Sequence, residues 1–229
     1  MKPYSIDPDL LSLEEFWDLI ANRRMLPGRS LLQEQMKERF DILGQSGIKN
    51  LGELLRMLGT KTKIQSAADR TGLSVDYLVL LKREAGSYLA KPFPLSNFPG
   101  IPFEYVELLK SGGIRNTRDL FEQVQDEEVQ HELSTSTGIP AYRLKELSIL
   151  CDLSRITGVG GIFARVLYET GIRSTQEFAG TDVPAILKRC QAVINKHGYA
   201  AGKLGEKDIE YGINYANVVV ACDRKTDKQ

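Results

Sequence analysis

The sequence is poor in cysteine and histidine and has no long apolar run. Its 229 residues include only three cysteines and two histidines. Because Cys151, Cys190 and Cys222 are odd in number and far apart, we expect buried free thiols in a reducing, cytoplasmic setting and no disulfide framework. No segment approaches the roughly 18–20 apolar residues of a membrane span. The first ten residues also lack the basic and apolar regions of a signal peptide.

Sequence patterns for catalysis or metal binding are equally scarce. Neither His131 nor His197 has a second ligand at the spacing His-x-x-x-His or Cys-x-x-Cys. The chain has no Gly-x-Ser-x-Gly elbow and no Walker loop. We therefore expect no metal, no cofactor and no catalytic residue. The alternative is a lesion-processing glycosylase, for which Lys188 or Asp182 would be the catalytic candidate, although the sequence nearby shows no aromatic base pocket.

Neither basic nor acidic side chains are in excess, because the chain has 30 of each. A neutral chain is unlike the clearly basic proteins that bind nucleic acid non-specifically. The charges are nevertheless uneven. Residues 93–153 carry 5 basic and 10 acidic side chains, whereas residues 154–203 carry 7 and 3. If nucleic acid binds, the later segment is the better contact.

Regularly spaced glycines are the most informative feature that is present. A "Gly-Ile" pair occurs at Gly47, Gly113 and Gly171, and a second glycine turn follows each pair after 25, 25 and 27 residues, at Gly72, Gly138 and Gly198. A further turn precedes two of the pairs by 13 residues, at Gly100 and Gly158. Such self-similarity indicates a repeat architecture.

Between the glycines the sequence predicts short helices almost throughout. Capping signals such as Ser12, Asn50 and Ser74 precede apolar residues at helical spacing. The expected helices after the first cover residues 31–43, 51–58, 64–70, 75–88, 103–111, 117–124, 127–135, 141–153, 163–170, 174–179, 183–196 and 206–221.

The predicted fold class is all-α, with tandem helix-hairpin-helix (SAM-like) repeats packed into a compact helical array. The proline-rich residues 91–102 are the best candidate boundary between repeats. The expected parts are an N-terminal helical extension (1–25), a degenerate repeat unit (26–92), a second hairpin unit (93–153), a third unit with the best-preserved hairpin (154–221) and a polar tail (222–229), of which residues 224–229 are expected to fray.

The hairpin at residues 157–162 carries the strongest chemical prediction. Gly158 permits a turn that a side chain would obstruct, and Gly160 leaves the first N–H groups of the next helix open. The N–H groups of Gly160, Gly161 and Ile162 are therefore predicted to bind phosphate. The other residues assigned to this nucleic-acid site are Thr157, Arg155, Arg165, Arg173, Lys188 and Arg189.

Two structural alternatives apply to this hairpin. It can be merely a tight connection between packed helices, and Arg155 can pair locally with Asp152 instead of reaching phosphate. The other hairpins are interpreted as structural, because Pro102 and Pro140 remove an N–H group and the turn at Gly72 lacks the small residue that lets the helices approach.

The segment from Leu150 to Gly160, with its pattern Asp-Leu-x-Arg-Ile-x-Gly-Val-Gly, followed by Gly171-Ile172-Arg173-Ser174-Thr175, resembles a family of uncharacterised bacterial and archaeal proteins. That family is a domain of unknown function built of tandem helix-hairpin-helix-like units. The resemblance covers residues 93–200 well and residues 40–90 faintly. It implies an all-helical fold and, by analogy with other helix-hairpin-helix proteins, DNA binding.

The sequence thus favours a non-enzymatic protein that binds the DNA phosphate backbone without sequence preference. The alternative is a helical scaffold that binds another protein and uses its hairpins only for packing. No membrane partner is expected, and the sequence leaves the oligomeric state open.

Overall fold

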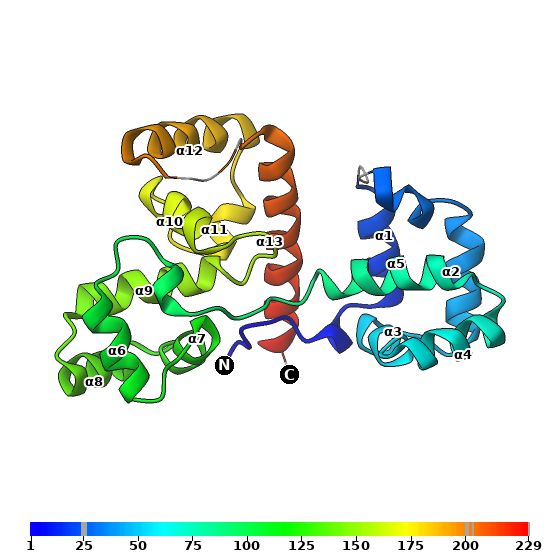
Figure 1. Cartoon of the computed structure of the whole chain (residues 1–229), viewed down its shortest axis with the longest axis horizontal. Helices are drawn as coiled ribbons and strands as arrows, with labels where there is room; N and C mark the ends of the chain where they lie inside the picture. Colours follow the sequence, from blue (N-terminus) through cyan, green and yellow to red (C-terminus); the bar gives the residue numbers. More distant parts are fainter. Residues whose placement is uncertain (24–26, 200–201, 203, 229) are drawn as a thin grey trace. The chain divides into compact units, whose positions relative to one another are not determined.

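The computed structural model describes residues 1–23, 27–199, 202 and 204–228, and over these residues the chain is helical, without a β-strand. The helices form two compact units (Figure 1). One unit comprises residues 6–89, and the other combines residues 1–5 with residues 90–229. The all-α class is confirmed.

The 6–89 unit surrounds a core that includes Phe16, Leu43 and Leu81, all fully or almost fully buried. Its α-helices are α1 (Leu13–Ala21), α2 (Met36–Gln45), α3 (Leu51–Met57), α4 (Lys61–Thr71) and α5 (Val75–Gly86), with 3-10 helices at Pro8–Leu10 and Pro27–Leu32. The buried carboxylate of Glu84 on α5 pairs with Arg23 and Arg29. The predicted capping box at Ser12 and Glu15 opens α1.

The second unit contains the remaining helices. They are the 3-10 helix Leu95–Asn97, α6 (Phe103–Ser111), α7 (Thr117–Gln123), α8 (Glu127–Thr137), α9 (Ala141–Leu153), α10 (Gly161–Glu169), α11 (Thr175–Ala179), α12 (Val183–His197) and α13 (Glu206–Thr226). The long helix α13 runs beside α11 and α12 (Figure 1). Gly212 allows this approach, because a Cβ atom there would lie 3.1 Å from the Phe178 ring of α11.

The first five residues belong to this second unit through Tyr4. The Tyr4 hydroxyl lies 2.9 Å from the Ser154 hydroxyl and accepts a hydrogen bond from Thr117 at 2.8 Å. The Tyr4 carbonyl accepts from Arg155. The 6–89 unit is therefore inserted, along the sequence, between two segments that fold together.

The glycine turns predicted from spacing all have positive φ angles. The φ angle is between 66° and 95° at Gly47, Gly72, Gly100, Gly113, Gly138, Gly158, Gly171 and Gly198. A left-handed backbone is easily adopted only by glycine, so the periodic glycines mark helix ends and turns, as the sequence indicates.

Three expectations about the elements need correction. The helix expected over residues 31–43 begins only at Met36, because a 3-10 helix occupies Pro27–Leu32. The chain does not fray at Arg224, since α13 continues to Thr226 and its Asp223 pairs with buried Arg155. The helix expected to start at Phe163 starts two residues earlier, at Gly161.

Candidate nucleic-acid interface at the start of α10

The start of α10 leaves its backbone donors open. Gly160 is the N-cap residue and supplies no side-chain hydrogen bond. The first intrahelical bond runs from the Ala164 N–H to the Gly160 carbonyl. The N–H groups of residues 160–163 make no hydrogen bond to any residue that the structure describes. Gly160 and Ile162 are exposed, so this end of α10 presents the donors that an anion would need.

The three glycines of the hairpin differ in whether, and why, the fold needs glycine at their positions. Gly158 has a φ of +89°, which requires glycine. Gly161 allows a close approach, because a Cβ atom there would lie 2.2 Å from the Asn97 carbonyl oxygen. Gly160 has an ordinary φ of −81°, and a Cβ atom there would meet nothing within 4 Å. Nothing within the described protein therefore requires glycine at position 160.

The helices on either side of the hairpin pack as the sequence predicts. Val159 is 3% exposed and fills the space inside the turn, while Ile156, Ala164 and Leu167 are at most 1% exposed. The small Ala164 lies one turn into α10. This packing fixes the direction in which the N–H groups of α10 point.

Arg155 does not line the interface. Its side chain is buried, and its guanidinium donates to Asp223 at 3.0 Å, to Asp152 at 3.1 Å and to the Tyr4 carbonyl at 3.1 Å. It also lies over the Phe121 ring. Burial is the largest single effect and lowers the pKa of Arg155, but the hydrogen bonds and charges of Asp223 and Asp152 together outweigh it and raise the pKa. The predicted phosphate contact is replaced by the local pair with Asp152 and by a second acid 68 residues away.

Arg165 is buried in the same way. Its Nε donates to the Pro99 carbonyl at 2.8 Å, and its Nη1 donates to Glu146 of α9. Glu146 also accepts from Arg143. Arg165 thus ties α10 to α9 and to the turn before α6. The prediction that it adds charge to the bound phosphate is inconsistent with this position.

Two of the remaining predicted cations, Arg173 and Arg189, lie away from the hairpin. Arg173 donates to the carbonyls of Tyr168 and Ile172, and Arg189 donates to the Thr170 carbonyl. These are carbonyls at the C-terminal end of α10, about 13 Å from its start at 1.5 Å per residue, where cations complement the helix dipole. Lys188 is exposed on α12. The structure therefore does not gather the five basic residues around residues 157–162.

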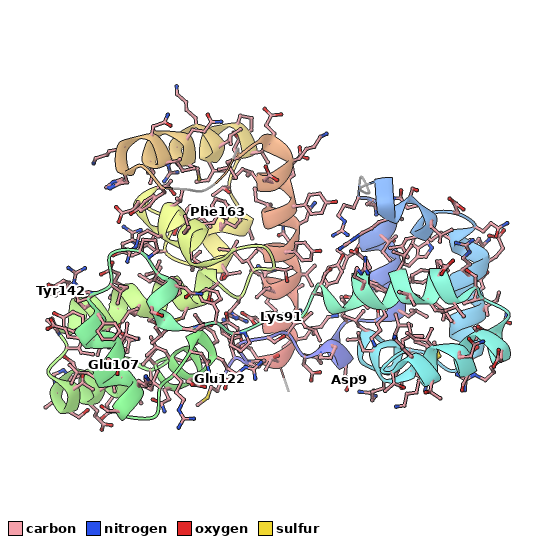
Figure 2. All side chains as sticks on the ribbon, viewed as in Figure 1. Asp9, Lys91, Glu107, Glu122, Tyr142 and Phe163 are labelled. Atoms are coloured by element: carbon pink, nitrogen blue, oxygen red, sulfur yellow. The ribbon has the colours of Figure 1, made fainter. Side chains whose placement is uncertain are left out.

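A hollow beside the hairpin was not predicted from the sequence. Its volume is about 630 Å³, and its walls are residues 157–163 together with Leu204 and one face of α13 that carries Asp208, Tyr211 and Tyr215. Phe163 of α10, labelled in Figure 2, belongs to this wall. The spacing of residues 208, 211 and 215 is that of one helical face, but no short motif in the sequence connects that face to the hairpin.

The other hairpins differ from that of α10 in their first residues. Pro102 and Pro140 stand at the N-caps of α6 and α9 without capping those helices, and the first turns carry Phe103 and Tyr142, which are 72% and 66% exposed. Tyr142 points outward (Figure 2). In the 6–89 unit, Ser74 caps α5 by accepting from the Tyr77 N–H at 3.2 Å.

The described residues contain no group of three potential metal ligands. None of the helices in the described ranges is both long and apolar enough to cross a membrane. None of the three cysteines forms a disulfide bond with another described residue, and all three are buried, as expected. Burial raises the pKa of the Cys190 thiol to about 11 and that of Cys151 well above its ordinary value. Asp182 caps α12 by accepting from the Ala185 N–H.

Comparison with known proteins identifies the second unit. A family model described as a domain of unknown function (DUF4332) matches residues 99–216. The chain belongs to this family. The match includes the whole hairpin and every residue that lines the hollow, and it leaves residues 6–89 outside. No curated protein and no solved structure matches the sequence.

Proposed function

We propose that this DUF4332 protein binds the phosphate backbone of nucleic acid, without sequence preference, through the N–H groups at the start of α10. The observation that carries the proposal is Gly160. Its φ is ordinary and its surroundings are open, yet it occupies an N-cap at which Ser, Asp or Asn would satisfy a donor. Glycine at such a position suits the close approach of a ligand to the backbone.

The corrected positions of the arginines change the expected affinity. Arg155 and Arg165 hold the hairpin in place from inside the fold, and neither guanidinium is exposed. Binding then depends on uncharged N–H groups and the helix dipole, with few charged contacts. We therefore expect weak binding and a smaller salt dependence than an interface with six or more phosphate contacts would show.

We propose in addition that the chain is a series of helix-hairpin-helix units. Three junctions support this idea, because the same four residue types follow one another in each. A positive-φ glycine is followed by a buried Ile, an exposed basic residue and the N-cap residue of the next helix. The side chain of that N-cap residue accepts a hydrogen bond from the backbone N–H of an acidic residue three positions later. The junctions are Gly47 to Glu53, Gly113 to Asp119 and Gly171 to Glu177. In each, that acid also accepts from the N–H of the basic residue.

The test is a titration of labelled 30-base DNA, in low and moderate salt, with wild-type protein and two variants. Gly160→Asp places a carboxylate at the open end of α10, where it blocks phosphate and at the same time caps the helix. Ser74→Asp makes the same change in charge at a helix that is already capped. We expect Gly160→Asp to abolish binding and Ser74→Asp to retain it. Wild-type protein that is folded but binds no DNA at low salt would contradict the proposal.

The second candidate is the helical scaffold for another protein. The exposed aromatic side chains Phe103 and Tyr142 favour it, because large apolar groups at the first turns of α6 and α9 are typical of contact surfaces. Under this function, replacing both aromatics with Ser would abolish binding of the protein partner. Gly160→Asp would leave that binding unchanged, which separates the two functions.

A further inference from the structure

The proposed phosphate contact leaves the hollow between the start of α10 and α13 unexplained. Its volume of about 630 Å³ falls within the roughly 300–1,000 Å³ of ligand pockets. Apolar and aromatic groups form most of its wall, with Ile162 and Phe163 on one side and Leu204, Tyr211 and Tyr215 on the other.

Two polar features among the described residues that line the hollow lie at separate places. The unpaired N–H groups of residues 160–163 belong to the α10 side. On the α13 side, the Asp208 carboxylate accepts from the Gly205 N–H at 2.9 Å and lines the hollow. A negative group would be attracted to the first side and repelled by the second. A ligand with an anionic end and an N–H-bearing planar end would satisfy both.

We infer that the hollow accepts an unpaired nucleobase whose phosphate is bound at the start of α10. Aromatic side chains such as Tyr211 provide a stacking surface, and stacking tolerates every base because each has a π-face. Each base also carries an N–H donor on its pairing edge for Asp208. In a duplex these edges are already paired and the bases are stacked, so the hollow selects single strands or unpaired ends.

This inference rests on the proposed function but makes a separate prediction. The phosphate contact alone would bind single strands and duplexes similarly. With the base in the hollow, the single strand gains an interaction that the duplex cannot make. We expect the wild-type protein to bind a 12-base single strand at least tenfold more tightly than the matching duplex.

The experiment measures the affinities of wild-type protein for three labelled ligands by fluorescence anisotropy. These are the single strand, its duplex, and a single strand with abasic sites in place of its central nucleotides. The abasic strand keeps the phosphates and lacks the bases, so its affinity should fall to that of the duplex. This arm requires no change in the protein and cannot be confused with misfolding.

Single-residue variants then test whether the hollow causes the preference for the single strand. Tyr211→Ala should remove the advantage of the single strand and leave duplex binding unchanged, whereas Tyr211→Phe should retain it. Tyr142→Ala is the matched control, because this exposed tyrosine lies on α9 and does not line the hollow. It should change neither affinity.

The outcomes distinguish the two proposals. Equal affinity for single strand and duplex, with both lost in Gly160→Asp, would overturn the base site and leave the phosphate site standing. An abasic strand that binds as tightly as the intact one would do the same. No binding of any of the three ligands would overturn the proposed function and the base site together.

Discussion

The starts of α5 and α10 differ in whether a side chain caps their first backbone N–H groups. Both helices follow a positive-φ glycine and a buried apolar residue, Gly72-Leu73 and Gly158-Val159. At α5, Ser74 occupies the N-cap and satisfies a backbone donor. At α10, Gly160 leaves its donors open. Because Gly at an N-cap leaves a helix roughly a few tenths of a kcal/mol less stable than Ser does, the open end of α10 is slightly less stable at the site where we place the ligand.

A network of buried hydrogen bonds supports the α10 hairpin. The α10 hairpin directly follows Arg155, which is held by Asp223, Asp152 and the Tyr4 carbonyl. A buried network of this kind fixes the hairpin without a cap. We conclude that α10 is rigidly positioned and locally unsatisfied, a combination typical of binding sites.

The largest expected effect on stability comes from removing the support of α10. Arg155→Met leaves two carboxylates without their buried partner and should lower the free energy of unfolding by about 3–5 kcal/mol. Urea unfolding would measure it. The control is Arg56→Met, because Arg56 pairs with Asp9 on the surface and such pairs contribute at most about 1 kcal/mol. Similar losses in the two variants would contradict the structural role assigned to Arg155.

A smaller loss is expected at the close approach of α10 to the chain before α6. In Gly161→Ala the new methyl group would lie 2.2 Å from the Asn97 carbonyl oxygen, so the backbone must shift. Overpacking of this kind costs about 1–3 kcal/mol. Thermal unfolding monitored by circular dichroism would reveal it, and an unchanged melting temperature would show that residues 97 and 161 do not approach in solution.

Ser74→Ala tests the capped hairpin. The change removes the acceptor of the Tyr77 N–H and should destabilise the 6–89 unit by about 1 kcal/mol. Hydrogen exchange of amides in the first turn of α5 would accelerate. If exchange there stays the same while the global stability falls, the cap is not what holds α5.

The smallest effect is expected from giving α10 the cap it lacks. Gly160→Ser should raise the free energy of unfolding by a few tenths of a kcal/mol, about the difference between Ser and Gly at N-caps. The hydroxyl would compete with phosphate for the same N–H groups, so nucleic-acid affinity should fall as stability rises. A loss of stability in this variant would mean that position 160 needs glycine for folding, which would remove the argument for a ligand.

The local features of the fold were predictable from the sequence because they depend on neighbouring residues. Caps such as Asn50 and the left-handed glycines such as Gly171 follow from the chemistry of a few adjacent positions. Only one of the two acidic partners of Arg155 was predictable from the sequence. Asp152 is three residues away, but Asp223 is 68 residues away, and no periodic pattern links it to the hairpin.

The sequence predicted the backbone donors of the candidate site but not the positions of the side chains around it. The sequence indicated the open N–H groups, since glycine spacing sets the turn. It misplaced the cations, because a count of charge along residues 154–203 ignores acids such as Glu146 that neutralise Arg165 from another helix. The hollow was missed because Tyr211 and its neighbours reach the hairpin only through the packing of α13 on α11.

The most direct test of the open helix end is nuclear magnetic resonance of protein labelled with ¹⁵N-glycine. An unlabelled oligonucleotide is added, and the amide signals of Gly160 and Gly161 are compared with that of Gly72 in the capped hairpin. The account predicts that the α10 glycine signals shift with increasing oligonucleotide while the Gly72 signal remains in place. Binding that moves neither α10 signal, or moves Gly72 equally, would contradict it.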